Sequence, residues 1–352
     1  MNHKERVLAA VNLEEPDRVP WSPYFGFAGN VYNGLCEYFN VDPRDSMRLF
    51  EKLDADVFIS DPYPPAESIK RFPDGSYRDD WGVVHKPIPS PGFGTRIVDS
   101  PIKSIEDFER YEPPDPHMLI FDQLDRDIEQ YGGEYAIMSG IGFTLFERAW
   151  TLRGFRRILM DFYRNPSFTE KLLDMITDYV VEVAKLVVER PIDIYWIGDD
   201  YGDQRGLFMS PDVWRRFIKP RLRRIVEVPK SKGIHVFIHS DGNVSAIIED
   251  LIEVGITILN PVQPLALDPA WVKDKFGDRL CLFGTIDIQK TLPFGTPQDV
   301  VDEVKLRMET CGQGGGLILA PSHSVTPETP VENVLALVEA IKKYGRYPIK
   351  YP

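Results

Sequence analysis

The chain has 352 residues, of which 43% are hydrophobic and 27% charged, so it is long enough to bury a large core. The formal net charge, 41 − 54 = −13, argues against a nucleic-acid partner, because a phosphate-binding surface needs clustered cations. Three cysteines in no recognisable spacing argue against a disulfide framework and indicate a reducing compartment. The amino-terminal residues lack a signal-peptide core, and no apolar run approaches the ~18 residues that span a bilayer, so we expect a cytoplasmic protein without membrane contact.

The first sixty residues predict helices separated by extended segments. Residues 3–13 form an amphipathic helix, and 18–25 are a proline-punctuated, extended segment that is a candidate first strand. Residues 30–53 are expected to be helical in two pieces, because a proline interrupts the pattern. Residues 54–61 read as a compact strand that ends in the carboxylate of Asp61.

Residues 66–116 differ in character from the rest of the chain. Prolines and glycines interrupt short alternating runs, a pattern that indicates a β-hairpin insertion. Such an insertion would either lie over the functional site as a lid or form a plain surface excursion, and the sequence favours neither.

From residue 117 onward, helices and strands alternate regularly. After a helix at 117–131, strands are expected at 135–142, 192–197, 234–238, 256–259, 280–283 and 317–320. Helices are expected at 144–190, with a break near Asn165-Pro166, and at 211–232, 243–254, 268–276, 296–310 and 330–343. Alternation of this kind produces a parallel sheet, and the two early strands bring the count to eight.

Eight such units predict a (β/α)8 TIM barrel, with the functional site at the carboxyl ends of the strands. We expect residues 1–352 to form this single barrel domain, with an amino-terminal helical extension and the 66–116 insertion. The alternative, a doubly wound open sheet, would need a glycine-rich phosphate-binding fingerprint after an early strand, and the sequence has none there.

Polar residues stand at the ends of the predicted strands: Asp61, Glu147, Asp199, Asp200, His239, Asp241, Asn260, Asp287 and His323. Residues two apart on a strand face the same side, so His239 and Asp241 can point at one spot. Barrel closure would bring His323 within reach of the same point. The three could hold a metal with a water or substrate oxygen as fourth ligand, which is the pattern of catalytic zinc.

Each of these residues also has a structural interpretation. His239 could be a packing residue, and Asp241 could cap the following helix, since Asp and Asn favour that place. Asp199 and Asp200 could cap or solvate a loop. The remaining histidines outside the strands are expected at the surface: His3, His85 and His117.

Several segments resemble the uroporphyrinogen decarboxylase superfamily, in order along the chain: residues 1–20, 198–202, 210–220, 239–243, 284–287, 315–321 and 329–334. The resemblance implies a (β/α)8 barrel, usually paired as a homodimer. True decarboxylases of this superfamily hold the substrate carboxylates with an early Met-Arg-Gln-Ala-Gly-Arg stretch, where residues 21–29 of this chain contain no arginine. Their strand-end aspartate does have a counterpart in Asp61, so a decarboxylase remains an alternative, as does a non-catalytic binding barrel.

The other branch of the superfamily consists of corrinoid-linked methyltransferases. Members that methylate thiols hold zinc with a His-x-Cys pair and a later cysteine; this chain has His239-x-Asp241 and His323 at the matching positions. Because thiolates quench the Lewis acidity of zinc, a His/Asp/His set implies a harder metal that suits an oxygen leaving group. We therefore expect a zinc-dependent methyltransferase that demethylates a methoxylated, aromatic small molecule. The corrinoid (cobalamin) would arrive on a partner protein that docks over the barrel mouth.

The remaining strand-end residues receive roles from the same hypothesis. Glu147 or Asp200 would be a further ligand or the proton donor to the leaving oxygen, and Asp61 would serve the decarboxylase alternative. Aromatic side chains near the entrance could hold a methoxylated ring, although aromatics are more often core residues. The expected substrate contacts are Tyr24, Phe25, Phe143, Trp196 and Asp199.

Overall fold

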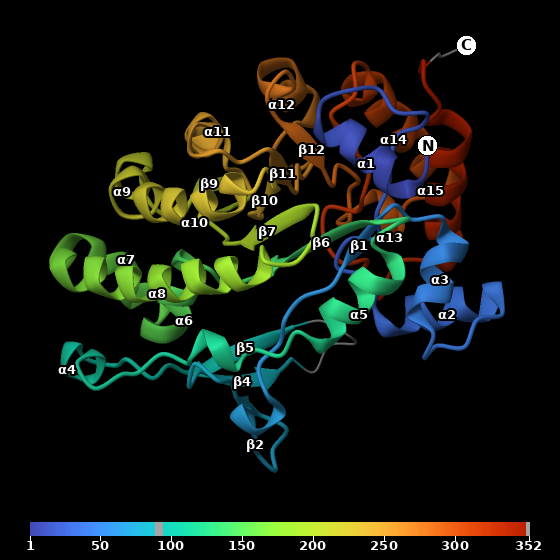
Figure 1. The fold of residues 1–352 in the computed structure, drawn as a ribbon. Helices are drawn as coiled ribbons and strands as arrows, with labels where there is room; N and C mark the ends of the chain where they lie inside the picture. Colours follow the sequence, from blue (N-terminus) through green and yellow to red (C-terminus); the bar gives the residue numbers. More distant parts are fainter. Residues whose placement is uncertain (89–93, 350–352) are drawn as a thin grey trace.

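A computed structural model describes residues 1–88 and 94–349. Within these residues a seven-stranded parallel sheet curls around the centre of the molecule, and Figure 1 shows helices around it. Its strands, in spatial order, are β1 (Val57–Ile59), β6 (Ala136–Ile141), β7 (Ile194–Gly198), β10 (His235–His239), β11 (Ile258–Asn260), β12 (Cys281–Phe283) and β13 (Leu317–Ile318). The predicted α/β class with a parallel sheet is confirmed.

The expected first strand is not a regular strand. Its residues run between the two edges of the sheet: Ser22 N donates to Leu319 O at 2.9 Å, and Asp56 N donates to Trp21 O at 2.9 Å. Leu319 N in turn donates to Pro20 O at 2.9 Å. Prolines have no N–H to offer a ladder, so this segment joins β13 to the start of β1 through isolated hydrogen bonds. The count of eight regular strands was therefore wrong by one.

The helices follow the alternation that the sequence predicts, with finer breaks. The α-helices are α1 (His3–Val11), α2 (Gly29–Phe39), α3 (Ser46–Leu53), α4 (Ile105–Phe108), α5 (Asp122–Tyr131), α6 (Phe146–Arg153), α7 (Phe155–Arg164), α8 (Pro166–Val187), α9 (Pro211–Phe217), α10 (Lys219–Ser231), α11 (Ile248–Val254), α12 (Pro269–Phe276), α13 (Thr291–Phe294), α14 (Pro297–Arg307) and α15 (Val331–Tyr344). None of the helices in the described part is long and apolar enough to cross a membrane. The predicted helical stretch at 144–190 does break at Pro166, as expected, and it has a second break at Gly154, which takes a φ of 94°.

The insertion forms an antiparallel sheet of four short strands: β2 (Lys70–Arg71), β3 (Tyr77–Arg78), β4 (Val84–Pro87) and β5 (Thr95–Asp99). The predicted hairpin corresponds to β4 and β5, while Pro89 and Pro91 lie outside the described residues. Trp81 anchors this sheet: its ring lies 4.6 Å from that of Tyr179 on α8 and 4.5 Å from the guanidinium of Arg148 on α6. Figure 1 accordingly shows the small sheet beside these helices, apart from the central strands.

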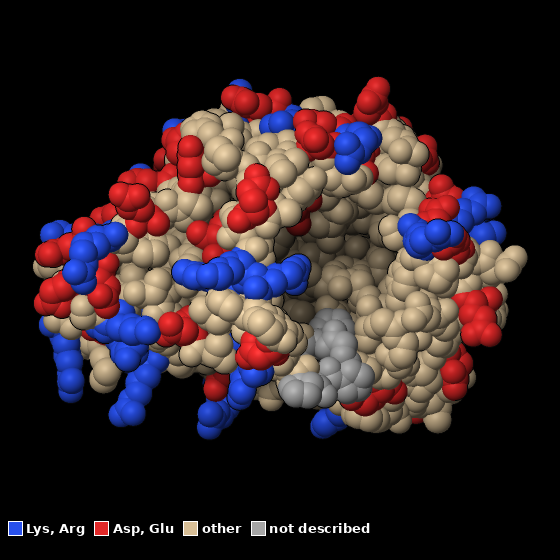
Figure 2. Space-filling model, turned by 90° about the horizontal axis from the view of Figure 1, so that it is seen from below, with Lys and Arg blue, Asp and Glu red and all other residues tan. Residues whose placement is uncertain are grey.

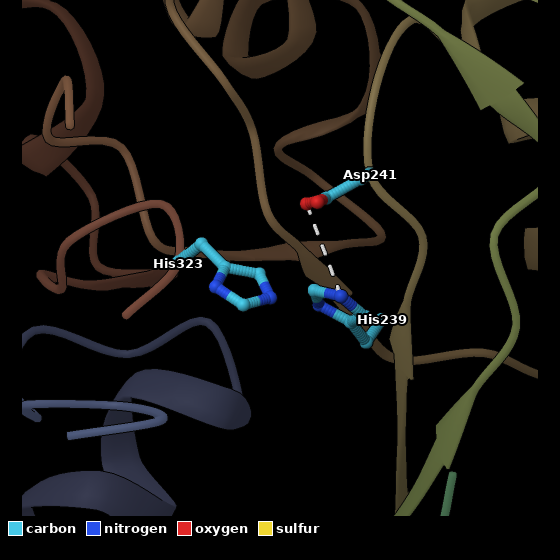
Figure 3. Close-up of side chains that lie close together, drawn as sticks. All are labelled: His239, Asp241 and His323. Atoms are coloured by element: carbon cyan, nitrogen blue, oxygen red, sulfur yellow. Dashed lines mark ion pairs between the residues drawn. The ribbon is translucent and has the colours of Figure 1, made fainter. Parts of the chain in front are cut away.

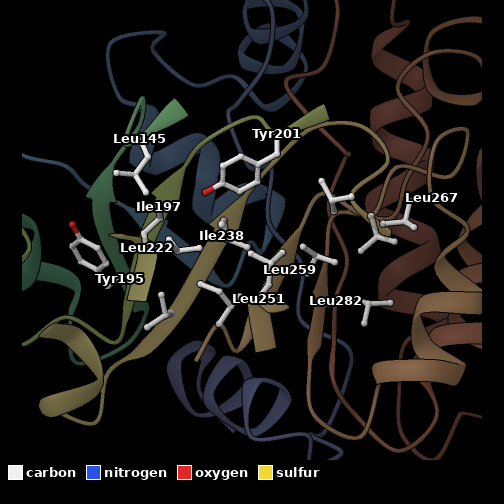
Figure 4. Close-up of a cluster of buried hydrophobic side chains, with 14 of the residues drawn as sticks. Leu145, Tyr195, Ile197, Tyr201, Leu222, Ile238, Leu251, Leu259, Leu267 and Leu282 are labelled. Carbon is white, nitrogen blue, oxygen red and sulfur yellow. The ribbon is translucent and has the colours of Figure 1, made fainter. Parts of the chain in front are cut away.

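Two hydrophobic cores lie on opposite faces of the curled sheet. On β10, Val236 and Ile238 belong to the core between sheet and helices, part of which Figure 4 shows, whereas Phe237 points inward. The interior core also receives apolar side chains from α1, whose Lys4 N donates to Glu134 O just before β6 begins. Because α1 covers the amino ends of the strands, the carboxyl ends are left for a functional site.

The completely buried carboxylate of Asp56 ties the amino-terminal region to the sheet. It accepts hydrogen bonds from His3 Nδ1 at 2.8 Å, Arg6 Nη1 at 2.7 Å, Arg18 Nη1 at 2.7 Å and Trp21 N at 2.9 Å. Burial favours the protonated acid, but the His3 hydrogen bond and the Arg18 charge outweigh it and lower the pKa of Asp56. The prediction of His3 as a surface residue was wrong, because this contact half-buries it.

We expect Asp56→Asn to lower the free energy of unfolding by about 3 kcal/mol, because it removes the buried charge that Arg6 and Arg18 share and leaves them only the more exposed Asp17 and Asp54. Urea unfolding at pH 7 measures the change. Asp42→Asn is the matched control, since Asp42 forms an exposed ion pair with Arg44 and should change stability little. Equal unfolding midpoints for the two variants would contradict this role of Asp56.

Candidate metal centre

The carboxyl ends of β10 and β13 bring three predicted residues together. His239 ends β10, Asp241 follows two residues later, and His323 lies in the loop after β13. One ligand atom from each residue lies within 4.8 Å of the others, and Figure 3 shows the three side chains converging from two sides. Their proximity is as the strand arrangement predicts, whereas their role as metal ligands stays a prediction.

A neighbouring amide orients the His239 ring. Asn260, next to His239 in the sheet register, donates from Nδ2 to Phe283 O at 3.2 Å, so its Oδ1 faces His239 Nδ1 at 2.7 Å. His239 Nδ1 must then carry the proton, and the Nε2 lone pair is directed at Asp200 and Asp241, each with an oxygen 3.8 Å away. This is the arrangement that a metal-binding histidine requires.

A second amide supports Asp241. Gln263 accepts a hydrogen bond from Gly242 N at 2.8 Å through Oε1 and donates from Nε2 to Asp241 Oδ1 at 3.4 Å. Sequence reasoning placed Asn260 at a strand end without a role and missed Gln263 altogether. Their positions in the sequence could have indicated these roles: Asn260 ends β11 and Gln263 follows it, and β11 is the strand beside β10.

Asp241 does not cap the following helix, which was its alternative role. Asn243 Oδ1 instead accepts the Ser245 N–H at 3.1 Å, at the start of the next helical turn. Burial raises the pKa of Asp241 to about 6, against the opposing influence of His239 and with the added repulsion of Asp200.

His323 is held by its own loop. Its Nδ1 accepts the Ser324 N–H at 2.7 Å, which places the proton of the neutral ring on Nε2. Burial, and then the nearby His239, lower the pKa of His323 to about 4, so the ring is uncharged at neutral pH. An uncharged imidazole can bind a metal, although ligation through Nε2 would displace that proton and the Ser324 contact.

The adjacent acids Asp199 and Asp200 point in different directions. Asp199 is completely buried and accepts hydrogen bonds from Phe146 N at 3.0 Å and Glu147 N at 2.7 Å, so it caps the start of α6. Both of its oxygens are thus engaged within the fold, and this position gives the predicted role as a substrate contact no support. Burial, and then the charges of Asp200 and Asp199, raise the pKa of Glu147 well above its usual range.

A cavity of about 340 Å³ adjoins the three-residue cluster. Three of the expected aromatic contacts, Tyr24, Phe25 and Trp196, line it together with Asp61. The Phe25 ring stands next to the cluster, 4.9 Å from the His239 ring and 4.7 Å from the His323 ring. Figure 2 shows one face of the molecule hollowed near its centre, with mainly uncharged side chains forming the visible wall.

Phe143 is the exception among the expected aromatic contacts. It is 42% exposed, is not among the described residues that line this cavity, and lies 5.5 Å from the Arg148 guanidinium. Its prediction as a substrate contact gains no support from this position.

Asp61 is fixed at the wall of the cavity by two hydrogen bonds to one oxygen. Its Oδ1 accepts from Gly140 N at 2.9 Å and from Trp196 Nε1 at 2.7 Å. The indole needs glycines beside it, since a Cβ at Gly198 would lie 2.9 Å from the Trp196 ring. Burial raises the pKa of Asp61 to about 6, although both hydrogen bonds oppose this rise.

Comparison with known proteins shows which family the chain belongs to. A model described as uroporphyrinogen decarboxylase matches residues 91–344, well over half of the chain. The chain belongs to the uroporphyrinogen decarboxylase family. The family resemblance expected from the sequence motifs is thereby confirmed.

The sequence identity to individual family members is modest. A methylcobamide:CoM methyltransferase of Methanosarcina barkeri is 31% identical over 175 residues, which is 50% of this chain and 49% of that protein, so the match spans only about half its length. A uroporphyrinogen decarboxylase of Chlorobium phaeovibrioides is 27% identical over 69% of this chain and 70% of its own. A solved structure, a methyltransferase from Methanosarcina mazei, superposes with a TM-score of 0.72 at 22% identity, covering 98% of this chain and 99% of its own, and thus shares the fold.

We expect Asp61→Asn to change how stability depends on pH. The pKa of Asp61 is higher in the folded chain, about 6 against an ordinary 3.8, so its contribution to stability falls as pH rises from about 4 to about 6. Asparagine keeps both Oδ1 hydrogen bonds but has no such proton. The variant should therefore gain up to about 3 kcal/mol relative to wild type between pH 4 and pH 7 in urea unfolding. Parallel stability curves for the two proteins would show that Asp61 is not perturbed.

Proposed function

We propose that this protein is a zinc-dependent methyltransferase that moves a methyl group from a methoxylated aromatic molecule to the corrinoid of a separate protein. The observation that carries the proposal is the convergence of His239, Asp241 and His323 beside an aromatic-lined cavity. The M. barkeri relative, a methylcobamide:CoM methyltransferase by name, supports the corrinoid as the second reactant.

The donor set fits zinc. Two imidazoles and one carboxylate are common zinc ligands, and ligand atoms of a tetrahedral site lie roughly 3.3 Å apart. His239 Nε2 and Asp241 Oδ1 are already 3.8 Å apart. Zinc held by these residues, without thiolates, would supply Lewis acidity to an ether oxygen.

Other residues of the chain would orient the proposed ligands and supply a proton. Asn260 would keep the His239 lone pair directed at the cluster, and Asp200 would hold the Asp241 backbone N–H, which it accepts at 2.8 Å. Glu147, whose pKa burial raises, would give its proton to the aryl oxygen as the bond from that oxygen to the methyl carbon breaks. The methyl group would leave with its new bond to the acceptor, and Glu147 would be left ionised.

The surrounding architecture belongs to the same proposal. A corrinoid-carrying partner would dock over the carboxyl ends of the strands, where the cluster lies. We propose that residues 1–352 act as one barrel domain, paired as a homodimer, and that the 66–116 insertion could serve as a lid.

A uroporphyrinogen decarboxylase that uses Asp61 is the second candidate, because Asp61 lines the cavity and its pKa is raised. The described residues that line the cavity include no lysine or arginine, whereas a substrate with eight carboxylates calls for cations. Formation of coproporphyrinogen from uroporphyrinogen would favour the decarboxylase over the methyltransferase. A metal-free protein that turns over neither substrate would favour a non-catalytic binding barrel.

We expect purified protein to contain one zinc per chain, and His239→Ala and His323→Ala each to lose most of it. Elemental analysis by mass spectrometry measures the content. His235→Ala is the matched control: His235 starts the same strand, about 13 Å from His239 along it. If zinc is absent, or equal in all four proteins, the metal site is wrong.

We expect Glu147→Gln to slow methyl transfer from aryl methyl ethers by about 100-fold, because glutamine has no proton to give the leaving oxygen. The loss should be larger for ethers of weakly acidic phenols than for ethers of acidic ones, whose oxygen leaves without help. Methylation of reduced cobalamin, followed by its absorbance, measures the rates. Glu249→Gln, at an exposed residue paired with Arg279, is the control. A loss independent of phenol acidity would rule out Glu147 as the proton donor.

A further inference from the structure

The Tyr24 hydroxyl is a buried polar group without a hydrogen-bond partner among the described residues. Tyr24 is only 1% exposed, and its ring packs on those of Phe237 and Phe283 at the mouth of the interior core. Leaving a buried hydroxyl unpaired is unfavourable, so such a group needs an explanation. Of the buried hydroxyls without partners, Tyr24 alone lines the 340 Å³ cavity within the described chain.

Asp61 offers a second unused polar atom to the same cavity. Both hydrogen bonds that hold its carboxyl group, from Gly140 N and Trp196 Nε1, end on Oδ1. Oδ2 receives no hydrogen bond from the described residues, although a carboxylate oxygen can accept two. Tyr24 and Asp61 thus both line the cavity, and each has a polar atom that no described residue pairs with. Neighbouring atoms cover the Tyr24 oxygen, so a ligand in the cavity reaches it once the ring shifts.

The rest of the wall is mainly apolar. Phe25, Phe50, Phe58 and Met47 contribute side chains, and no lysine or arginine is among the described lining residues. An apolar wall with only these two unpaired polar groups among its described residues favours a flat, uncharged ring that carries one hydrogen-bonding substituent. A carboxylate on that ring would meet no cation in this wall and would face Asp61.

We propose that the cavity binds methoxyphenols, that is, aromatic methyl ethers with a free ring hydroxyl, and that Tyr24 and Asp61 recognise this hydroxyl. The ring hydroxyl donates to Asp61 Oδ2 and accepts from the Tyr24 O–H, so each group gains the partner it lacks. This substrate class rests on the proposed methyltransferase function, while the binding preference can be measured without it. A ring without the hydroxyl would leave both groups unpaired, which is the strongest basis for rejecting an analogue.

Calorimetric binding of 2-, 3- and 4-methoxyphenol and of methoxybenzene tests the proposal. At least one methoxyphenol should bind wild type about tenfold or more tightly than methoxybenzene. Tyr24→Phe and Asp61→Asn should each reduce this ratio severalfold, since phenylalanine has no hydroxyl and asparagine presents an N–H in place of Oδ2. Tyr38→Phe, at a tyrosine that is 61% exposed, should leave the ratio unchanged.

The proposal is overturned if methoxybenzene binds as tightly as every methoxyphenol, or if both site variants keep the wild-type ratio while their thermal unfolding is normal. The assay contains no corrinoid, so its result does not depend on methyl transfer. Transfer from methoxybenzene at the same kcat/KM as from the methoxyphenols would refute the substrate class and leave the methyltransferase function standing. A tenfold binding preference for a methoxyphenol without any methyl transfer would support the binding site and refute the methyltransferase function.

Discussion

The Asp56 carboxylate is the interaction on which the arrangement of the rest depends. It is fully buried, yet it stays ionised because His3, Arg6 and Arg18 converge on it and the Trp21 N–H completes its shell. A buried charge with this many partners fixes geometry more than it adds net stability. Here it fixes α1 against β1 and sets where the extended segment after Arg18 must run.

The extended segment after Arg18 runs from the amino ends of the strands, where Asp56 holds it, to their carboxyl ends. Beyond Trp21 it presents Tyr24 and Phe25, and then it pairs with the loop that holds His323: Val325 N donates to Gly26 O at 3.0 Å and Ala28 N to Val325 O at 2.8 Å. Phe25 takes a φ of 58°, which is unfavourable for a bulky residue, and these flanking hydrogen bonds keep it there. One face of the cluster is thus built on rigid strands and the other on a loop that Asp56 helps to position.

Sequence periodicity was sufficient for the central strands and for the proximity of His239, Asp241 and His323, since parallel strands place their carboxyl ends at one edge. Periodicity gave wrong predictions where individual side chains decide the local structure. The prolines at 20 and 23 turned the expected first strand into a few isolated bridges, and Asp199 turned away from the mouth although Asp200, its neighbour, did not. Successive residues after a strand face opposite sides, so two adjacent carboxylates cannot both be site residues unless the backbone bends. Asn260 and Gln263 support their neighbours across β10 and β11, and such support depends on register, which periodicity alone does not give.

The burial of acidic side chains near His239 determines the electrostatics at the carboxyl ends of the strands. Asp200 and Asp241 each place an oxygen 3.8 Å from His239 Nε2, and burial raises the pKa of Asp241 to about 6. Burial also raises the pKa of Glu147, and the charge of Asp200 adds to this rise. Without a cation such a cluster keeps protons, because like charges at close range oppose ionisation. A divalent ion would exchange places with those protons, so carboxylate ligands couple metal binding to proton release at mildly acidic pH. In a family whose fold is shared across different chemistries, exchanging ligand types at fixed strand ends alters the reactivity of the site while the barrel itself stays the same.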